Sequence, residues 1–164
     1  MLMCGVSDKT IATTLQFNFM NEGIDIKFND LPEINQFELK KYNLKFLEGK
    51  IFGNYIIYVC RDKFRDIHCN LITKGEKLFG NQNKKIPKEY SIGYLKNAIK
   101  LASVDWMKKY KKILFSSESD DKVNLYFRYA KYFQQKYKHG YVTEIAVHPY
   151  FRVKYFIGIY TNKI

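Results

Sequence analysis

The chain has 164 residues, of which 28 are Lys or Arg and 16 are Asp or Glu, so its formal net charge is +12. That length predicts one domain, residues 1–164, with a hydrophobic core, and it excludes two domains of ordinary size. A charge this positive favours anionic partners such as nucleic acid, phosphorylated cofactors or acidic protein surfaces. The abundance of Lys, Asn, Ile, Tyr and Phe is also what AT-rich codons supply, so we discount part of the charge.

The cysteines and the apolar runs bear on the cellular compartment. Cys4, Cys60 and Cys69 are odd in number and lack CxxC spacing, which argues against a disulfide framework and against a zinc site. We therefore expect a reducing compartment and no bound metal. No apolar run approaches the roughly 18 residues of a membrane span, so we also expect an intracellular protein without a membrane-spanning segment.

The first part of the chain allows two interpretations. Thr13–Phe19 alternates apolar and polar residues, as a half-buried strand does, and Ile24–Phe28 alternates in the same way after a turn. A hairpin of these two segments is one interpretation. Pro32 with Asp30 as a cap favours instead a short helix over Leu31–Leu39.

The next segments predict a three-stranded antiparallel meander. Leu44–Phe52 and Tyr55–Cys60 are strand-like and are joined by Gly53-Asn54, a strong signal for a two-residue hairpin. A third alternating run, Ile67–Leu71, follows a polar turn. The segment Lys74–Lys88 is rich in Gly, Asn and Lys and is predicted to be a loop.

Two amphipathic helices and a buried strand come next. Apolar residues at steps of three and four predict the first helix, with Ile92, Leu95, Ile99, Ala102 and Trp106 on one face. The same spacing predicts the second helix, with Val123, Tyr126, Ala130, Phe133 and Tyr137. Between them, Ile113–Phe115 fits a buried strand. Ser119 or Asp120 can cap the second helix, and Gly140 can end it.

The chain closes with a predicted hairpin of Tyr141–Val147, ended by Pro149, and Val153–Tyr160. The predicted fold is therefore α+β, with a mostly antiparallel mixed sheet and two principal helices. Nothing in the sequence determines the oligomeric state.

The order of elements from Leu44 to Ile164 resembles the fold of the GNAT acyltransferases. In that family a Gly-rich turn holds the cofactor pyrophosphate at the start of the first core helix, and a Tyr on the second helix protonates the leaving thiolate. The resemblance implies acetyl-CoA or another acyl-CoA as cofactor and Tyr137 or Tyr132 as the catalytic acid. It also implies these cofactor-binding residues: Ile92, Gly93, Tyr94, Lys84, Lys85 and Lys88.

A second hypothesis departs from catalysis. Small phage-encoded proteins with this element order but without the cofactor turn also resemble the chain. This resemblance implies a non-catalytic, virion-associated protein, located in the cytoplasm or in the virion, that binds an acidic partner. Fold alone does not decide between the two hypotheses.

Basic residues interleaved with aromatic ones point to nucleic acid as one such partner. Phosphate contacts combined with base stacking are typical of proteins that bind single strands. The candidate residues for this contact are Arg128, Lys131 and Lys138 on the second helix, and Lys108, Lys109, Lys111 and Lys112 at the end of the first.

Two further residue pairs have side chains suited to chemistry. His68 and His148 stand 80 positions apart, as in two-histidine phosphoesterases, but the residues beside them lack the hydroxyls of that motif, which favours ordinary surface or turn histidines. Cys60 and Cys69 would be a redox pair if they faced each other across a hairpin. Buried, unreactive cysteines are the commoner arrangement.

Overall fold

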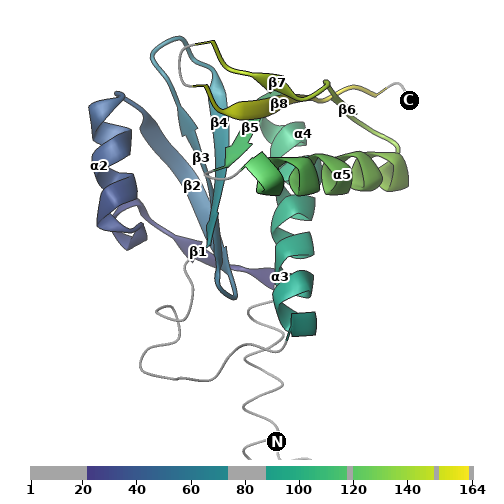
Figure 1. The fold of residues 1–164 in the computed structure, drawn as a ribbon, viewed down its shortest axis with the longest axis horizontal. Helices are drawn as coiled ribbons and strands as arrows, with labels where there is room; N and C mark the ends of the chain where they lie inside the picture. Colours follow the sequence, from purple (N-terminus) through teal and green to yellow (C-terminus); the bar gives the residue numbers. More distant parts are fainter. Residues whose placement is uncertain (1–21, 74–87, 118–119, 150–151, 163–164) are drawn as a thin grey trace, which may run out of the picture.

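A computed structural model describes residues 22–73, 88–117, 120–149 and 152–162. For residues 88–91 it describes the backbone only. The described part of the chain is an α+β fold built on one mostly antiparallel sheet of eight strands, in the order β1-β2-β3-β4-β5-β8-β6, with β7 also paired to β8. This confirms the predicted class and the mixed sheet. Helix α2 covers one face of the sheet, and α3 and α5 cover the other (Figure 1).

The predicted meander is present. Strands β2 (Lys45–Phe52), β3 (Tyr55–Arg61) and β4 (Ile67–Thr73) are antiparallel neighbours, and β1 (Ile24–Ile26) extends the sheet beyond β2. Gly53 forms the tight turn between β2 and β3 with a positive φ of 59°, a backbone conformation that glycine adopts without steric cost. The predicted strand Thr13–Phe19 lies outside the described residues, and so does the predicted loop Lys74–Lys88 except for Lys88, which is helical.

The short helix predicted over Leu31–Leu39 is confirmed, whereas the hairpin interpretation involves Thr13–Phe19, which lies outside the described residues. Helix α2 spans Glu33–Lys41, and its Leu39 is buried. Asp30 does not cap α2, however. Its carboxylate accepts a hydrogen bond from the backbone amide of Lys27 at 2.8 Å within a short 3-10 turn, Phe28–Asp30. The reason is that Pro32 separates this turn from α2 with an extended backbone.

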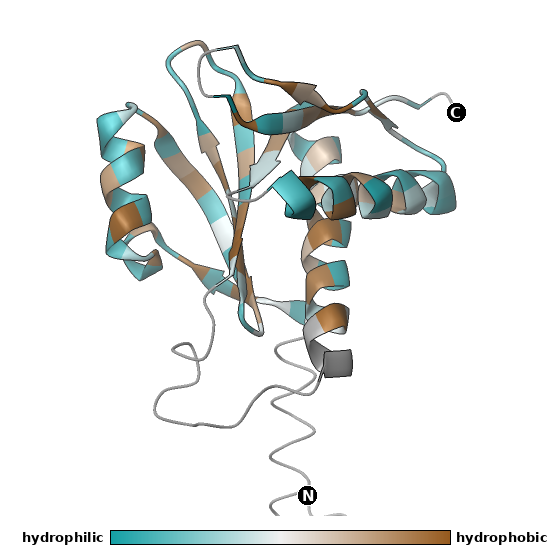
Figure 2. Cartoon of the chain, viewed as in Figure 1, coloured by the Kyte–Doolittle hydropathy of each residue, from teal (hydrophilic) through white to brown (hydrophobic). Residues whose placement is uncertain are grey.

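The first predicted helix is α3 (Lys88–Lys100), which continues through a π-helical segment, Leu101–Trp106, into α4 (Met107–Tyr110). Four of its five predicted core residues are buried, but Ile92 is 42% exposed. The buried face passes through Tyr94 instead, because the Tyr94 ring packs against the β2–β3 turn at Gly53. Figure 2 shows apolar positions, in brown, alternating with polar ones along α3.

The Ile113–Phe115 strand is confirmed as part of β5 (Lys112–Ser117), which is parallel to β4 and antiparallel to β8 (Lys154–Ile159). Ile113 is fully buried, and the Phe115 ring stacks on Phe156 of β8 with their centres 4.9 Å apart. Helices α5 and α4 therefore contact a strand that has neighbours on both sides, whereas α3 contacts β2 and β3. That strand joins the meander to the C-terminal part of the sheet.

Helix α5 spans Asp120–Tyr137 and buries all of its predicted core residues except Tyr137, which is 37% exposed. The prediction that Gly140 ends this helix is wrong by two residues. Lys138 already has a positive φ of 52°, so the helical backbone stops there. Gly140 serves another purpose, since a Cβ at this position would lie 2.9 Å from Cε of Met107.

The predicted strand Tyr141–Val147 is interrupted. Within this segment, only its two ends are strands that pair with β8, namely β6 (Tyr141–Val142) and β7 (Ala146–Val147). Between them, the Thr143 hydroxyl accepts a hydrogen bond from the Ile157 amide at 2.9 Å. A side chain thus replaces the backbone carbonyl that would continue the ladder. In the described part of the chain, no helix has the length and apolar character needed to cross a membrane.

Candidate functional site

A hollow lies between α3 and α5, which cross on one face of the sheet (Figure 1). We call it the α3–α5 groove, and its volume is about 680 Å³. Its lining residues are Lys96, Asn97 and Lys100 from α3 and Leu125, Arg128, Tyr129, Tyr132, Phe133, Lys136 and Tyr137 from α5.

Helical spacing explains how the groove wall is made. On α5, Arg128, Tyr132 and Lys136 follow one another at steps of four and form one ridge. A second ridge of α5 also has steps of four residues and consists of Leu125, Tyr129, Phe133 and Tyr137. On α3, Lys96 and Lys100 are also four residues apart. Each helix therefore presents two cations to the same space, about one turn apart on α3 and about two turns apart on α5.

The charge of the groove is of one sign. Four of its lining residues are cations, and no Asp or Glu is among the described residues that line it. Lys100 from α3 and Lys136 from α5 both lie over the Tyr137 ring, with Nζ 5.4 Å and 5.7 Å from its centre. Because these two ammonium groups approach the same ring, they repel each other. An anion bound in the groove would offset that repulsion.

Aromatic rings supply the other half of the wall. Lys96 Nζ lies 5.9 Å from the centre of the Tyr129 ring, and the Tyr132 ring meets the Phe133 ring edge to face at 5.3 Å. Phe133 is buried, whereas Tyr132 is 54% exposed. Cations beside exposed rings are the combination that recognises a phosphate together with a flat aromatic group.

The structure brings together three of the residues predicted from the sequence. Tyr132 and Tyr137, the predicted acids, and Arg128, predicted to contact nucleic acid, all line the α3–α5 groove. Lys131 and Lys138 are exposed but are not among its lining residues. Lys131 Nζ lies instead over the Phe127 ring, 5.1 Å from its centre.

The lysines at the end of the first helix do not form one surface. Lys109 Nζ lies 2.6 Å from the Glu48 carboxylate, so its charge is compensated, and Lys111 Nζ lies 4.5 Å from the centre of the Tyr160 ring. Lys108 and Lys112 are exposed. The positive φ of Lys111, 72°, turns the chain between α4 and β5 and separates Lys108 from Lys112.

The predicted cofactor residues are placed as follows. Lys84 and Lys85 lie outside the described residues, as does the side chain of Lys88, the first residue of α3. Ile92 and Gly93 are in the second turn of α3, where backbone amides ordinarily bond within the helix. The Tyr94 ring is buried against Gly53. The described geometry therefore gives no amide cradle at Ile92–Tyr94.

A second hollow, which we call the α2 cleft, lies on the opposite face of the sheet and has a volume of about 560 Å³. It meets the carboxyl ends of the parallel strands β4 and β5. Its lining residues are Pro32, Ile34, Asn35, Glu38, Asn70, Ile72, Thr73, Ser116, Ser117 and Val153. Ligands often bind at the carboxyl ends of parallel strands. The sheet separates this cleft from Tyr132 and Tyr137.

Burial raises the pKa of Tyr58 to about 12, even though the Asn70 side chain donates a hydrogen bond to the Tyr58 hydroxyl at 3.0 Å. Tyr58 is therefore a neutral phenol at physiological pH. The contact fixes Asn70, one of the polar groups that line the α2 cleft.

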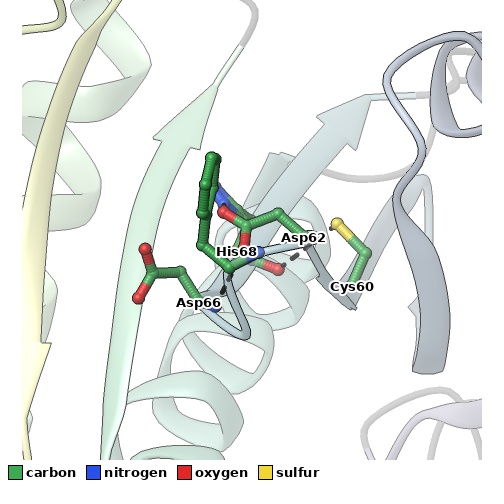
Figure 3. A network of polar contacts seen from close by, with 5 residues as sticks. Cys60, Asp62, Asp66 and His68 are labelled. Carbon is green, nitrogen blue, oxygen red and sulfur yellow. Dashed lines mark hydrogen bonds and ion pairs between the residues drawn. The ribbon is translucent and has the colours of Figure 1, made fainter.

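The histidines are not brought together. His68 is on β4, where its Nε2 lies 2.8 Å from the Asp62 carboxylate (Figure 3). Asp62 also accepts hydrogen bonds from the amides of Phe64 and Asp66, so it closes the β3–β4 turn. His148 follows β7, and the strands β5 and β8 lie between it and β4. This arrangement favours the structural interpretation of His68.

The cysteines point to opposite faces of the sheet. In the β3–β4 pairing, Cys60 lies opposite His68 and Cys69 lies opposite Val59. The two cysteines therefore occupy adjacent positions of the ladder, and side chains at adjacent positions point to opposite faces. Burial raises the pKa of Cys60 to about 12 and also raises the pKa of Cys69 well above its ordinary value. A redox pair is excluded by this geometry, and the prediction of buried cysteines is confirmed. In the described residues, no three potential metal ligands gather.

Comparison of the chain with protein-family models, curated proteins and solved structures gave no match. The chemistry of the groove itself is therefore the basis for a functional interpretation.

Most of the residues that line the α3–α5 groove were not predicted from the sequence. Lys96, Lys100 and Lys136 were not among the predicted site residues, although the four-residue spacing of Lys96 with Lys100 and of Tyr132 with Lys136 was available as a signal. The missing information was the crossing of the helices, which places the two basic faces against one hollow.

Proposed function

We propose that the chain binds nucleic acid and that the α3–α5 groove holds the phosphate groups. The observation that carries this proposal is the lining of the groove, in which Lys96, Lys100, Arg128 and Lys136 meet without a carboxylate among the described lining residues. Release of counterions by such a cluster is the main source of affinity for nucleic acid. The net charge of +12 adds long-range attraction.

Binding is tested by fluorescence anisotropy with a labelled oligonucleotide. The test variant is Lys100→Ala combined with Arg128→Ala, which removes one cation from each wall of the groove. The matched control is Lys40→Ala combined with Lys41→Ala. It removes the same charge from exposed positions on α2, on the other side of the sheet.

The groove variant is expected to lose at least tenfold in affinity, and the control is expected to stay within about twofold of the unmodified protein. Equal losses in both variants would mean that net charge, and not the groove, attracts the nucleic acid. A virion-associated protein that contacts a genome is compatible with the proposal.

A second candidate function is acyl-CoA-dependent N-acyl transfer on a GNAT-like fold. Two observations favour it: the order of elements matches the one that suggested the family, and the α2 cleft opens at the ends of the parallel pair β4 and β5. In this proposal the acyl group enters the α2 cleft at the carboxyl ends of β4 and β5. The placement of Tyr132 and Tyr137 behind the sheet weakens their proposed role as acids.

Isothermal titration with acetyl-CoA and with CoA tests the second candidate. Micromolar binding that Gly93→Leu abolishes would support it, and because a Cβ at Gly93 meets no atom within 4 Å, the variant is expected to fold. No heat at millimolar ligand would argue against it. Binding that Gly93→Leu spares and Lys100→Ala abolishes would assign CoA to the α3–α5 groove.

A further inference from the structure

The Tyr132 ring stands apart from the other tyrosines of the α3–α5 groove. It is 54% exposed. Lysine ammonium groups lie over Tyr129 and Tyr137, whereas in the described residues none lies over Tyr132. Phe133 meets it at an interplanar angle of 67°, so the two rings are not stacked face to face. A flat group can therefore stack on Tyr132 without first displacing a cation.

Cations stand one helical turn away on either side of this ring. Arg128 precedes Tyr132 by four residues and Lys136 follows it by four, and all three line the groove. Side chains at this spacing are neighbours, with roughly 5–6 Å between their Cβ atoms. A nucleotide within a strand has the same arrangement, since its base is flanked along the backbone by one phosphate on each side.

We propose that the groove selects single-stranded nucleic acid, with one base stacked on Tyr132 and the flanking phosphates bound by Arg128 and Lys136. This inference rests on the proposed function and names its substrate class. The bases of a duplex are already stacked on their neighbours, so a duplex base must be unpaired and unstacked before it can reach Tyr132. A single strand offers its bases at a much lower cost.

The test compares a labelled oligothymidine with a duplex of equal length, using Tyr132→Leu and Tyr132→Phe. Stacking of a base on an aromatic side chain contributes roughly 1–3 kcal/mol, so Tyr132→Leu is expected to weaken binding of the single strand by about 5- to 150-fold. Binding of the duplex is expected to change by less than about twofold. Tyr132→Phe keeps the ring and is expected to bind like the unmodified protein.

Three outcomes would overturn the inference. Equal weakening of both ligands by Tyr132→Leu, or no weakening of either, would remove the stacking role while leaving phosphate binding in the groove intact. Failure of the unmodified protein to bind either ligand would overturn the proposed function as well. Because Tyr132 is exposed, Tyr132→Leu is expected to keep the thermal stability of the unmodified protein, which identifies a loss of binding as local.

Discussion

Lys100 of α3 places its ammonium group 5.4 Å from the centre of the Tyr137 ring of α5, and this contact joins the two walls of the groove. Lys136 approaches the same ring at 5.7 Å. The ring attracts each cation through its electron-rich face, but the two cations repel each other. The helix crossing thus brings together like charges that an anion can neutralise.

Multivalent anions are therefore expected to stabilise the protein. Pyrophosphate that binds the folded state only would add about 2.7 kcal/mol to the free energy of unfolding at a concentration one hundred times its Kd. Thermal unfolding monitored by circular dichroism measures this as a rise in Tm. The rise should disappear in Lys100→Ala combined with Lys136→Ala and persist in the α2 control, Lys40→Ala with Lys41→Ala. A rise of equal size in both variants would place the anion elsewhere.

Two glycines should respond in opposite ways to alanine. At Gly53, which has φ 59°, a Cβ would lie 2.1 Å from Cδ2 of Tyr94, so Gly53→Ala forces the turn and the buried ring apart. We expect a loss of roughly 2 kcal/mol or more. At Gly93, within α3, a Cβ meets nothing within 4 Å, and Gly93→Ala should stabilise the helix by about 0.5–1 kcal/mol. Urea denaturation of both variants measures these changes, and a stabilised Gly53→Ala would contradict the packing at the turn.

Glu48 connects β2 to the end of the first helix. Its carboxylate accepts hydrogen bonds from Trp106 Nε1 at 2.9 Å, from Lys109 Nζ at 2.6 Å and from the Tyr110 hydroxyl. Burial by itself would raise the pKa of Glu48, but these donors outweigh it and lower the pKa below 4.5. We expect Glu48→Gln to cost about 1–2 kcal/mol near neutral pH, because the charge-assisted bonds are lost.

The pH dependence of this cost has a definite sign. A carboxyl with a lowered pKa stabilises the folded state above its unfolded pKa, and that stabilisation is lost as the pH falls through the folded pKa. The difference between Glu48→Gln and the unmodified protein should therefore shrink below pH 4.5. Denaturant unfolding at neutral and acidic pH measures it, with the exposed Glu144→Gln as control. A difference that grows on acidification would be inconsistent with the lowered pKa.

Cys60 and Cys69 should resist alkylation in the folded protein. Burial keeps both thiols protonated by raising their pKa values, to about 12 for Cys60, and also blocks access to the sulfur atoms. Iodoacetamide at mildly alkaline pH should modify them only after denaturant is added, as measured by peptide mass spectrometry. Rapid modification of Cys60 without denaturant would show that the α2 side of the sheet opens readily.

Local patterns were sufficient for most of the elements. Gly53-Asn54 between two apolar runs identified the β2–β3 hairpin, and Ile113–Phe115 identified β5, because turn chemistry and short-range periodicity determine these elements. Patterns failed where a distant contact decides the outcome. Ile92 is exposed because Tyr94 packs on Gly53, and the strand after Tyr141 is interrupted because the Thr143 hydroxyl bonds to Ile157.

The candidate site was predictable only in part for the same reason. Arg128 was identified from the mixture of basic and aromatic residues on α5, and Tyr132 and Tyr137 were identified from the resemblance to the GNAT family. Lys96 and Lys100 belong to another helix, and only the crossing of α3 and α5 shows that they share the groove. Helix periodicity defines the face of a helix but not the element that lies opposite that face.

The salt dependence of oligonucleotide binding tests the central claim most directly. For single strands, the slope of log K against log salt concentration is about −0.7 for each phosphate neutralised, so four groove cations predict a slope of about −3. Removing two of them, in Lys100→Ala with Lys136→Ala, should make the slope shallower by about 1.4, and the Lys40→Ala with Lys41→Ala control should leave it unchanged. A slope that stays the same in the groove variant, or that changes equally in the control, would contradict phosphate binding in the α3–α5 groove.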